Sequence, residues 1–400
     1  MSIKSIISTE KIPIKMWIDE NNVEESAIQQ AKNLANLPFV FKHIAIMPDV
    51  HTGYGATIGS VFAAKNTILP SAVGFDIGCG VAAVQTSLTN IDTETLKVIM
   101  GDVRKEIPIG VGSNNSEFNE DGMHALEDIL MSSKFLSEGN SIVMREWKKA
   151  GHALGSLGSN NHFIEIQKSD DGHIGIMLHS GSRNLGHQIA THYNKLAVEL
   201  NEKYYSVVPK KWELAFLPLD SEEGSNYRDE MEFCLAFAQA NRDIMMQVIK
   251  NIFTRHFKSI SFLDQINIHH NYAALENHFG KNVMVHRKGA TSAREGQMGL
   301  IPGDQGTASY VVCGLGNPKS FHSCSHGAGR ILGRKQAIRE LDMKEEVRKM
   351  EEKGILHSIR SQDDLDEAPG AYKNIEEVMK NQDDLVEIVV ELKPLAVVKG

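Results

Sequence analysis

Glycines surround a carboxylate and a thiol in the stretch Gly74-Phe-Asp-Ile-Gly-Cys-Gly80, which directly follows an apolar run. Glycine adopts backbone conformations that other residues avoid, so this pattern predicts a tight turn at the end of a buried strand. Such a turn can direct the side chains of Asp76 and Cys79 toward one point. One carboxylate and one thiol are too few ligands for a metal ion, so a metal site here requires histidines from elsewhere in the chain.

Histidines at two predicted strands can supply such ligands. A glycine-rich loop leads into a predicted strand that bears Asn161, His162 and Glu165. A second predicted strand ends at His179, and Arg183 lies in the turn that follows it. Either histidine alone is better explained as an ordinary hydrogen-bonded core residue, but two histidines beside glycine-rich turns indicate a metal site.

A third predicted strand ends in the pair His269-His270. Side chains alternate along a strand, so only one of the two can join the site. The candidate ligands are therefore Asp76, Cys79, His162, His179 and one of His269 and His270. Five ligands exceed one tetrahedral zinc ion, whereas two metal ions that share the Cys79 thiolate would use them all. Such ligands suit zinc or iron at least as well as manganese, and paired metal ions suit phosphoryl chemistry.

The stretch Ser325-His-Gly-Ala-Gly-Arg330 predicts an anion site. We expect its glycine turn to open a helix that ends near Glu340, because a helix N-terminus beside an arginine attracts phosphate. His326 would then meet the phosphate, and a histidine can carry a transferred phosphoryl or nucleotidyl group. The residue patterns alone thus indicate a metal-dependent phosphoryl or nucleotidyl transferase.

Composition excludes several classes of protein. No apolar run approaches the roughly 20 residues of a membrane span, and the N-terminal residues lack a signal-peptide pattern. The four cysteines lack CxxC spacing, which favours a reducing cytoplasm. The net charge of −9 argues against broad, non-specific binding of nucleic acid.

Periodicity predicts an α/β (α+β) chain. The length fits a single large α/β domain or two fused lobes, and we find no linker or repeat that would justify a boundary within residues 1–400. On the predicted helix 233–249, the Met and Phe residues read as core, and Asn241 and Arg242 are candidates for substrate contact. The predicted elements include a strand at 12–17, a helix at 24–35, a strand from Phe41 that ends at Pro48, helices within 187–260 and closing strands at 383–400.

A series of motifs, taken together and in order, resembles the RtcB family of RNA ligases over nearly the whole chain. The motifs are Pro48-Asp-Val-His51, Gly74-Phe-Asp-Ile-Gly-Cys-Gly80, Asn161-His-Phe-Ile-Glu165, His179-Ser-Gly-Ser-Arg183, His270-Asn271, Ser325-His-Gly-Ala-Gly-Arg330 and Val398-Lys-Gly400. The resemblance implies an α/β (α+β) fold over residues 1–400, a single large mixed-sheet domain of the RtcB type with a central metal and nucleotide pocket. It also implies joining of RNA 3′-phosphate or 2′,3′-cyclic phosphate ends to 5′-hydroxyl ends, in RNA repair or tRNA splicing.

The resemblance assigns roles to individual residues. GTP and two Mn²⁺ ions are the implied cofactors, and His326 is the implied site of the GMP–histidine intermediate. The implied metal ligands are Asp76, Cys79, His162, His179 and His270. The implied nucleotide contacts are Asn161, Glu165, Asp304, Ser309, His326, Gly327, Ala328, Gly329, Arg330, Tyr372 and Lys399. Arg183 is expected to hold a backbone phosphate of the RNA.

One position departs from the family pattern, because Asp304 stands where Ser or Thr is usual near the nucleotide. An acid there would repel a triphosphate unless it faced the base or a metal. The alternatives to a ligase are a metal-dependent phosphoesterase in which His326 only binds phosphate, and a non-catalytic protein that binds RNA ends. Nothing in the sequence argues against an additional activating protein. On an acidic chain, RNA contact is expected in one basic groove lined by Lys42, Arg183, Arg287, Lys288 and Arg294.

Overall fold

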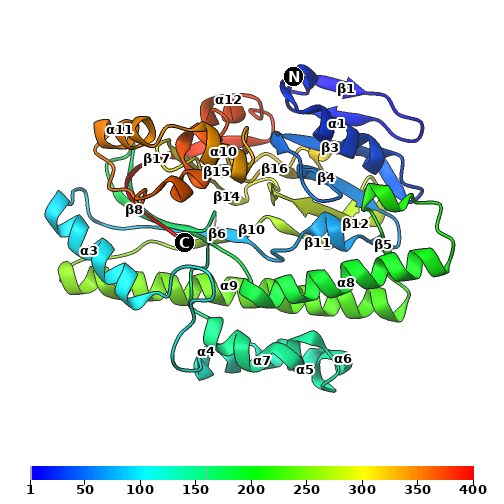
Figure 1. Ribbon diagram of the computed structural model, residues 1–400, viewed down its shortest axis with the longest axis horizontal. Coiled ribbons are helices and arrows are strands. Elements are labelled where there is room, and N and C mark those ends of the chain that lie inside the picture. The colour runs from blue at the N-terminus through cyan, green and yellow to red at the C-terminus, as the bar shows by residue number, and fades with distance from the viewer. Residues whose placement is uncertain (1, 160) are drawn as a thin grey trace.

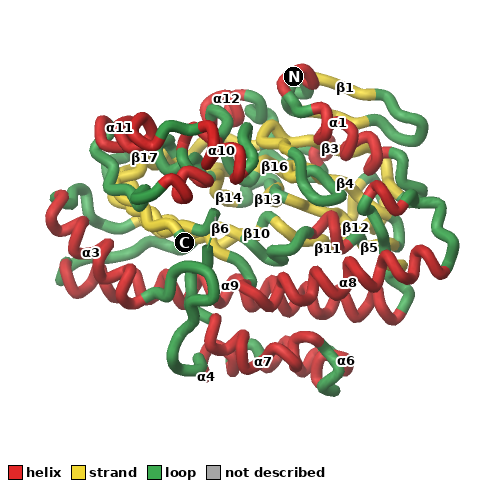
Figure 2. Tube along the Cα trace, in the orientation of Figure 1, coloured by secondary structure: helices red, strands yellow, loops and turns green. Residues whose placement is uncertain are grey.

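Two β-sheets form the centre of the computed structural model, which describes residues 2–159 and 161–400. The long helices α8 (Arg183–Lys203) and α9 (Glu222–His256) run side by side along one side of the sheets (Figure 1). The short helices α4 (Glu120–His124) to α7 (Ile142–Ala153) form a further layer beyond them. Helices and strands are thus both extensive (Figure 2), as the expected α/β (α+β) class requires.

The first sheet has six strands in the order β1-β2-β3-β4-β12-β11. All neighbouring strands are antiparallel except β2 and β3, which are parallel. The bounds are β1 (Ser5–Ile7), β2 (Ile14–Met16), β3 (Val40–His51), β4 (Ile58–Ala64), β11 (Asn271–His278) and β12 (Lys281–Lys288).

The second sheet has seven antiparallel strands in the order β10-β6-β8-β7-β17-β15-β14. The bounds are β6 (Gly80–Gln85), β7 (Phe163–Ser169), β8 (Ile174–Ser180), β10 (Ile266–His269), β14 (Met298–Ile301), β15 (Ser309–Gly314) and β17 (Val386–Lys399). Two further pairs join β5 (Thr67–Ile68) to β9 (Leu217–Pro218) and β13 (Ala290–Ser292) to β16 (Ser323–Ser325).

The remaining helices surround these sheets. They are α1 (Glu25–Ala35), α2 (Pro70–Val73), α3 (Thr93–Glu106), α5 (Glu127–Ser132), α6 (Lys134–Ser137), α10 (Arg334–Glu340), α11 (Met343–Glu352) and α12 (Ile375–Lys380). Among the described residues, no helix combines the length and apolar character that crossing a membrane requires.

Helix α9 supplies side chains to two hydrophobic clusters, which explains its long apolar pattern. Phe233, Cys234 and Phe237 pack with residues of α8, whereas Met245 and Met246 pack against strands of the second sheet. These residues are buried core, as the sequence predicted. Replacing a buried phenylalanine of this kind by alanine costs about 3–5 kcal/mol of stability.

Several predicted boundaries are wrong. Strand β3 continues past Pro48 to His51, because its pairing with β4 is irregular between Ile46 and His51 and requires no N–H from the proline. Strand β7 begins at Phe163, so Asn161 and His162 lie in the loop before it. The C-terminal segment forms one strand, β17, rather than several closing strands.

The glycine turn after His326 does not open a helix. Gly329 has a φ of +75°, a conformation outside the right-handed helical region, and a Cβ there would lie 2.1 Å from the carbonyl oxygen of Asp49. Arg330 then forms an isolated bridge with Tyr372, and α10 begins only at Arg334. The predicted helix N-terminus beside His326 is therefore wrong.

Candidate active site

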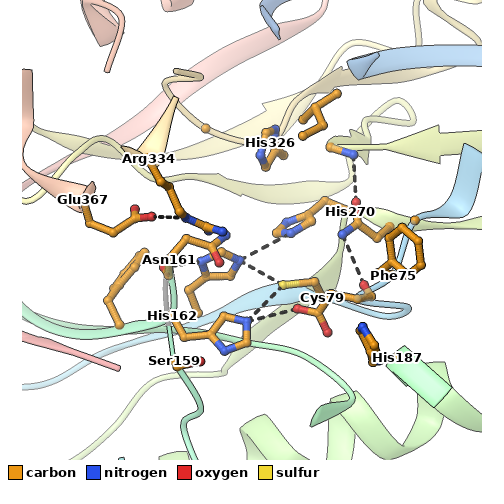
Figure 3. A pocket seen from close by; sticks show the side chains of 18 of the residues that line it. Phe75, Cys79, Ser159, Asn161, His162, His187, His270, His326, Arg334 and Glu367 are labelled. Atoms are coloured by element: carbon orange, nitrogen blue, oxygen red, sulfur yellow. Dashed lines mark hydrogen bonds and ion pairs between the residues drawn. The ribbon is translucent and has the colours of Figure 1, made fainter. Parts of the chain in front are cut away.

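A cavity of about 1470 Å³ is lined by residues from both sheets, from α7 and α8, and from the loops between them. Its lining includes at least one residue from each motif that carries the family resemblance. Figure 3 shows Cys79, His162 and His270 near its centre, with His326 on one side. Pocket volumes of about 300–1,000 Å³ are typical for one small ligand, so this cavity is large enough for more than one.

Two groups of potential metal ligands share the thiol of Cys79. Asp76 and His162 complete one group, and His179 and His270 complete the other. The Cys79 Sγ lies 3.5 Å from His162 Nε2 and 3.2 Å from His179 Nε2. His162 Nε2 lies 3.1 Å from a carboxylate oxygen of Asp76, and the Nε2 atoms of His179 and His270 lie 3.4 Å apart. The five residues that the sequence analysis grouped as candidate ligands, with His270 as the member of its pair, therefore lie together in the structure.

Backbone carbonyls orient two of the imidazoles. His162 Nδ1 lies 2.9 Å from the oxygen of Leu157, and His179 Nδ1 lies 3.1 Å from the oxygen of Asn161. A carbonyl only accepts hydrogen bonds, so both Nδ1 atoms carry a hydrogen and both Nε2 atoms face the cluster, where a bound metal ion would replace any proton on them. The buried Nδ1 of His270 has no hydrogen-bond partner among the described residues. Imidazole nitrogens gathered around a thiol and a carboxylate, with one buried unsatisfied nitrogen, fit a bound cation.

The electrostatics of the cluster also suit metal ions. Burial lowers the pKa of His179 and of His270 well below the ordinary value, so both rings are neutral. Burial disfavours ionisation of Asp76, but the hydrogen bond and charge of His162, together with Cys79 and His179, outweigh burial and lower the pKa of Asp76 to about 2. Burial and the neighbouring Asp76 raise the pKa of the Cys79 thiol well above its usual range. A cation reverses that preference, because a coordinated thiol loses its proton.

Asp49 fixes the orientation of His326. Its carboxylate oxygen Oδ2 accepts hydrogen bonds from the Nδ1 of His326, at 2.6 Å, and from the backbone N–H of His326, at 3.0 Å. Asp49 is fully buried, whereas the His326 side chain faces the cavity. The His326 and His270 rings lie 4.9 Å apart, so His326 is next to the metal-ligand cluster. This geometry leaves Nε2 of His326 as the nitrogen with the available lone pair.

A network of charges around the buried carboxylate of Glu367 forms one wall of the cavity. Arg330 Nη1 and Arg334 Nε each donate to Glu367 Oε1 at 3.0 Å, and Lys399 Nζ lies 3.7 Å from Oε2. The hydroxyl of Tyr372 donates to the same carboxylate. This network, which we call the cationic wall, consists of Arg330, Arg334, Glu367, Tyr372 and Lys399.

Glu165 and Asp304 lie beside the cationic wall. Burial raises the pKa of Glu165 to about 8, although Lys399 opposes this shift. The Asp304 carboxylate accepts hydrogen bonds from Gly306 N, at 2.7 Å, and from the Thr307 hydroxyl, at 2.9 Å. Asp304 therefore stabilises its own turn, which the sequence did not predict.

The other residues predicted to contact the nucleotide differ in position. Asn161, Gly327, Ala328, Gly329 and Arg330 all line the cavity. Ser309 is buried and does not line the cavity, and its hydroxyl accepts from Gly303 N and from the Gln167 amide.

The predicted basic groove is wrong. Arg287 is fully buried and pairs with Glu276, with Nη1 and Oε1 2.5 Å apart. Arg294 pairs with the same carboxylate, and Lys42 lies over the rings of Phe41 and Phe279. Of the five predicted residues, the cavity lining contains Arg183 and Lys288.

Asn241 and Arg242 are buried supports of the site and do not contact the cavity. Asn241 Oδ1 accepts from the backbone N–H of Gly155 at 2.7 Å. Arg242 Nη1 donates to the carbonyls of Gly78, at 3.0 Å, and Ser180, at 2.9 Å. Their predicted role in substrate contact is therefore wrong.

Sequence reasoning missed three residues of the site. Asp49 stood in a recognised motif, but nothing in the spacing indicated that it would reach His326. Glu367 ends the acidic run Gln362–Glu367, which is typical of a solvated surface. Arg334 is the first residue of helix α10, a position that by itself does not indicate a site.

Comparison with known proteins matches this chain to the family model of the tRNA-splicing ligase RtcB over residues 30–400. It is 38% identical to the RNA-splicing ligase RtcB of Escherichia coli K12, over 99% of each chain. It is 35% identical to the tRNA-splicing ligase RtcB of Methanococcus maripaludis, over 98% of this chain and 95% of that one. The corresponding protein of Thermococcus kodakarensis is 32% identical over the same shares. The chain therefore belongs to the RtcB family.

Proposed function

We propose that this protein is an RNA ligase that acts in RNA repair or tRNA splicing. It joins RNA 3′-phosphate or 2′,3′-cyclic phosphate ends to 5′-hydroxyl ends, with GTP and Mn²⁺. The single observation that carries the proposal is His326, which is held by Asp49 at the edge of two ligand groups that share Cys79. Family membership supports the same reaction class.

His326 is the proposed nucleophile. Its Nε2 attacks the α-phosphorus of GTP, an N–P bond forms, and the bond to the departing pyrophosphate breaks. The attacking imidazole ring gains positive charge, which the Asp49 carboxylate at Nδ1 offsets. The RNA 3′-phosphate, formed first by opening of any cyclic phosphate, takes the GMP from His326. The 5′-hydroxyl then attacks the activated phosphorus, and GMP leaves.

The proposed metal ligands divide between two Mn²⁺ ions. Asp76 and His162 would hold one ion and His179 and His270 the other, with Cys79 common to both ligand groups. Ions held by these residues would neutralise phosphate charge that otherwise repels an incoming nucleophile. The carbonyls of Leu157 and Asn161 keep the imidazoles in the ligating orientation.

The cationic wall is the part of the cavity that we propose binds GTP. Guanidinium and ammonium groups bind phosphate and the polar edge of a base. The proposed GTP contacts are Asn161, Glu165, Asp304, Ser309, Gly327, Ala328, Gly329, Arg330, Tyr372 and Lys399. Arg183, which lines the cavity and donates to Ser156 and Leu157, is the proposed contact for an RNA phosphate.

The phosphoesterase alternative is not favoured. Hydrolysis of a phosphate end requires neither a histidine oriented by a buried carboxylate nor an additional wall of charged groups for a nucleotide. All four cysteines are free, which suits the reducing compartment that we propose for this enzyme, the cytoplasm.

The test is incubation with α-labelled GTP and Mn²⁺, with the unaltered protein compared with His326→Ala. We expect an acid-labile GMP adduct that is absent from the variant. Addition of RNA with the stated ends should discharge the adduct and yield a joined product. Absence of any adduct would contradict the ligase reaction and favour the phosphoesterase.

A further inference from the structure

We propose that Tyr54, Phe75 and His187 form an aromatic shelf in the cavity that stacks the terminal nucleobase of the RNA. This inference rests on the proposed function, because it concerns the substrate of that reaction. The three rings come from the loop before β4, the turn before β6 and helix α8. No metal or nucleotide role was assigned to any of them.

The three rings are neighbours in the exposed lining of the cavity. The centroids of Tyr54 and Phe75 lie 5.5 Å apart with their planes at 55°, and those of Phe75 and His187 lie 5.7 Å apart with their planes at 33°. Tyr54 is 41% exposed and Phe75 is 37% exposed, and all three residues line the cavity. Exposed aromatic rings beside a phosphate-handling site are the usual means by which proteins hold unpaired bases of RNA.

The shelf lies on the side of the ligand cluster opposite the cationic wall. Figure 3 shows Phe75 and His187 on one side of Cys79, and Arg334 and Glu367 on the other. Phe75 directly precedes the potential metal ligand Asp76. A base on the shelf would therefore have its phosphate beside the ligand cluster, between the shelf and His326.

Helix α8 gives a second link between the shelf and phosphate binding. Arg183 is the first residue of α8 and has a φ of +58°, and His187 follows it by four residues. Arg183 and His187 both line the cavity. The start of α8 therefore presents a ring for a base and a guanidinium for an adjoining phosphate to the same cavity.

Lys288 holds the shelf in shape. Its Nζ donates to the carbonyls of Tyr54 at 2.6 Å, of Ala56 at 3.0 Å and of Ser71 at 2.9 Å. Ser71 belongs to α2, which leads directly into the turn that bears Phe75. One buried cation thus ties together the two segments that carry the first two rings. Preorganised rings lose little conformational entropy when a base binds.

The shelf suits an RNA base better than the guanine of GTP. A guanine site needs hydrogen-bonding groups for the edge of the base, and those groups gather on the cationic wall side, with Glu165 and Lys399. The shelf offers mainly ring faces, which every base can stack on. We therefore expect it to bind the RNA end with little base preference.

The test uses the full-length protein loaded with Mn²⁺, without GTP, and short RNAs that carry 2-aminopurine at one end. One RNA has the probe at its 3′-phosphate end and the other at its 5′-hydroxyl end. We expect stacking to quench the probe at one end, which identifies the end that the shelf holds. In Phe75→Ala and Tyr54→Ala we expect the quenching to be lost and the Kd for that RNA to rise on the order of tenfold.

Two further variants control this test. Phe75→Tyr keeps a ring and should restore both quenching and affinity. Tyr205→Ala removes a tyrosine that is 91% exposed and does not line the cavity, and it should behave as the unaltered protein. Unchanged quenching and unchanged Kd in both Phe75→Ala and Tyr54→Ala would overturn the proposal.

Formation of the GMP adduct, measured separately, distinguishes the two proposals. Loss of quenching in Phe75→Ala together with no adduct in the unaltered protein would support the shelf and contradict the ligase. A normal adduct with unchanged quenching in Phe75→Ala would support the ligase and contradict the shelf. A rise in the GTP concentration that Phe75→Ala needs for adduct formation, with RNA binding unchanged, would mean that the shelf holds guanine and would overturn the proposal.

Discussion

Asp49→Asn isolates the contribution of one buried charge to the reactivity of His326. In the structure, Asp49 Oδ2 accepts two hydrogen bonds from His326, through Nδ1 at 2.6 Å and through the backbone N–H at 3.0 Å. An asparagine has nearly the same shape and keeps one acceptor oxygen, but it lacks the charge that offsets the imidazolium during attack. The fold should therefore persist while nucleophilic attack on GTP slows.

The expected magnitude follows from the lost charge. A hydrogen bond to a charged group contributes about 1.5–3 kcal/mol, and each 1.36 kcal/mol corresponds to about tenfold in rate. Adduct formation in Asp49→Asn should thus be slower by about tenfold to a hundredfold, or by more if the amide donates to Nδ1 and forces the hydrogen onto Nε2.

The assay is a single-turnover time course with α-labelled GTP, accompanied by a melting temperature for each protein. Asp363→Asn is the matched control, because Asp363 is exposed and lies on the surface. An unchanged adduct rate in Asp49→Asn, with an unchanged melting temperature, would refute the role of Asp49 in orienting and activating His326.

Three further predictions concern the metal ligands, a buried acid and a buried base. Cys79→Ala should abolish binding of both Mn²⁺ ions, whereas His270→Ala should weaken the binding of one ion, because Cys79 belongs to both ligand groups. Titration calorimetry would measure this, and equal losses of Mn²⁺ binding in the two variants would contradict the assignment. Glu165 has a pKa of about 8 in the folded protein and an ordinary value of 4.5 when unfolded, so the wild-type protein loses stability as the pH rises from about 4.5 to 8. Glu165→Gln should therefore melt at the same temperature as the wild type near pH 5 and at a higher temperature near pH 8, and a difference that is constant with pH would count against the buried acid. Arg242→Lys should weaken Mn²⁺ binding on the order of tenfold, because Arg242 bonds Gly78 and Ser180, which adjoin ligands Cys79 and His179; calorimetry that finds the wild-type Kd would contradict this support.

The ligand cluster could be predicted from the sequence because its residues stand beside glycines and at strand ends. Asp76, Cys79 and His179 all occupy such positions, where local patterns determine which way a side chain points. Strand alternation left the choice between His269 and His270 open. In the structure His270 joins the cluster, whereas His269 Nδ1 lies 3.1 Å from Arg242 Nη2 and 3.0 Å from the carbonyl oxygen of Gly78.

Burial and long-range pairing could not be predicted in this way. Arg287 reads as a surface cation until β11 and β12 pair, which brings the carboxylate of Glu276 beside it. Asp49 and His326 are far apart in the sequence, so no local period relates them. The failure of the helix predicted after His326 has a local cause instead, the positive φ of Gly329.

The positions of the buried cations explain how an acidic protein can bind RNA ends. Arg242, Arg287 and Lys288 donate to carbonyls or to Glu276 inside the protein, so their charge is used to support the site. Fewer lysines and arginines are then left in the cavity to neutralise RNA phosphates than the sequence suggested. Ion-pair contacts with phosphates make binding steeply dependent on salt, whereas stacking on aromatic rings does so much less. On these proposals, RNA affinity comes to a larger extent from bound metal ions and from the aromatic shelf, and we expect it to decrease only modestly with added salt.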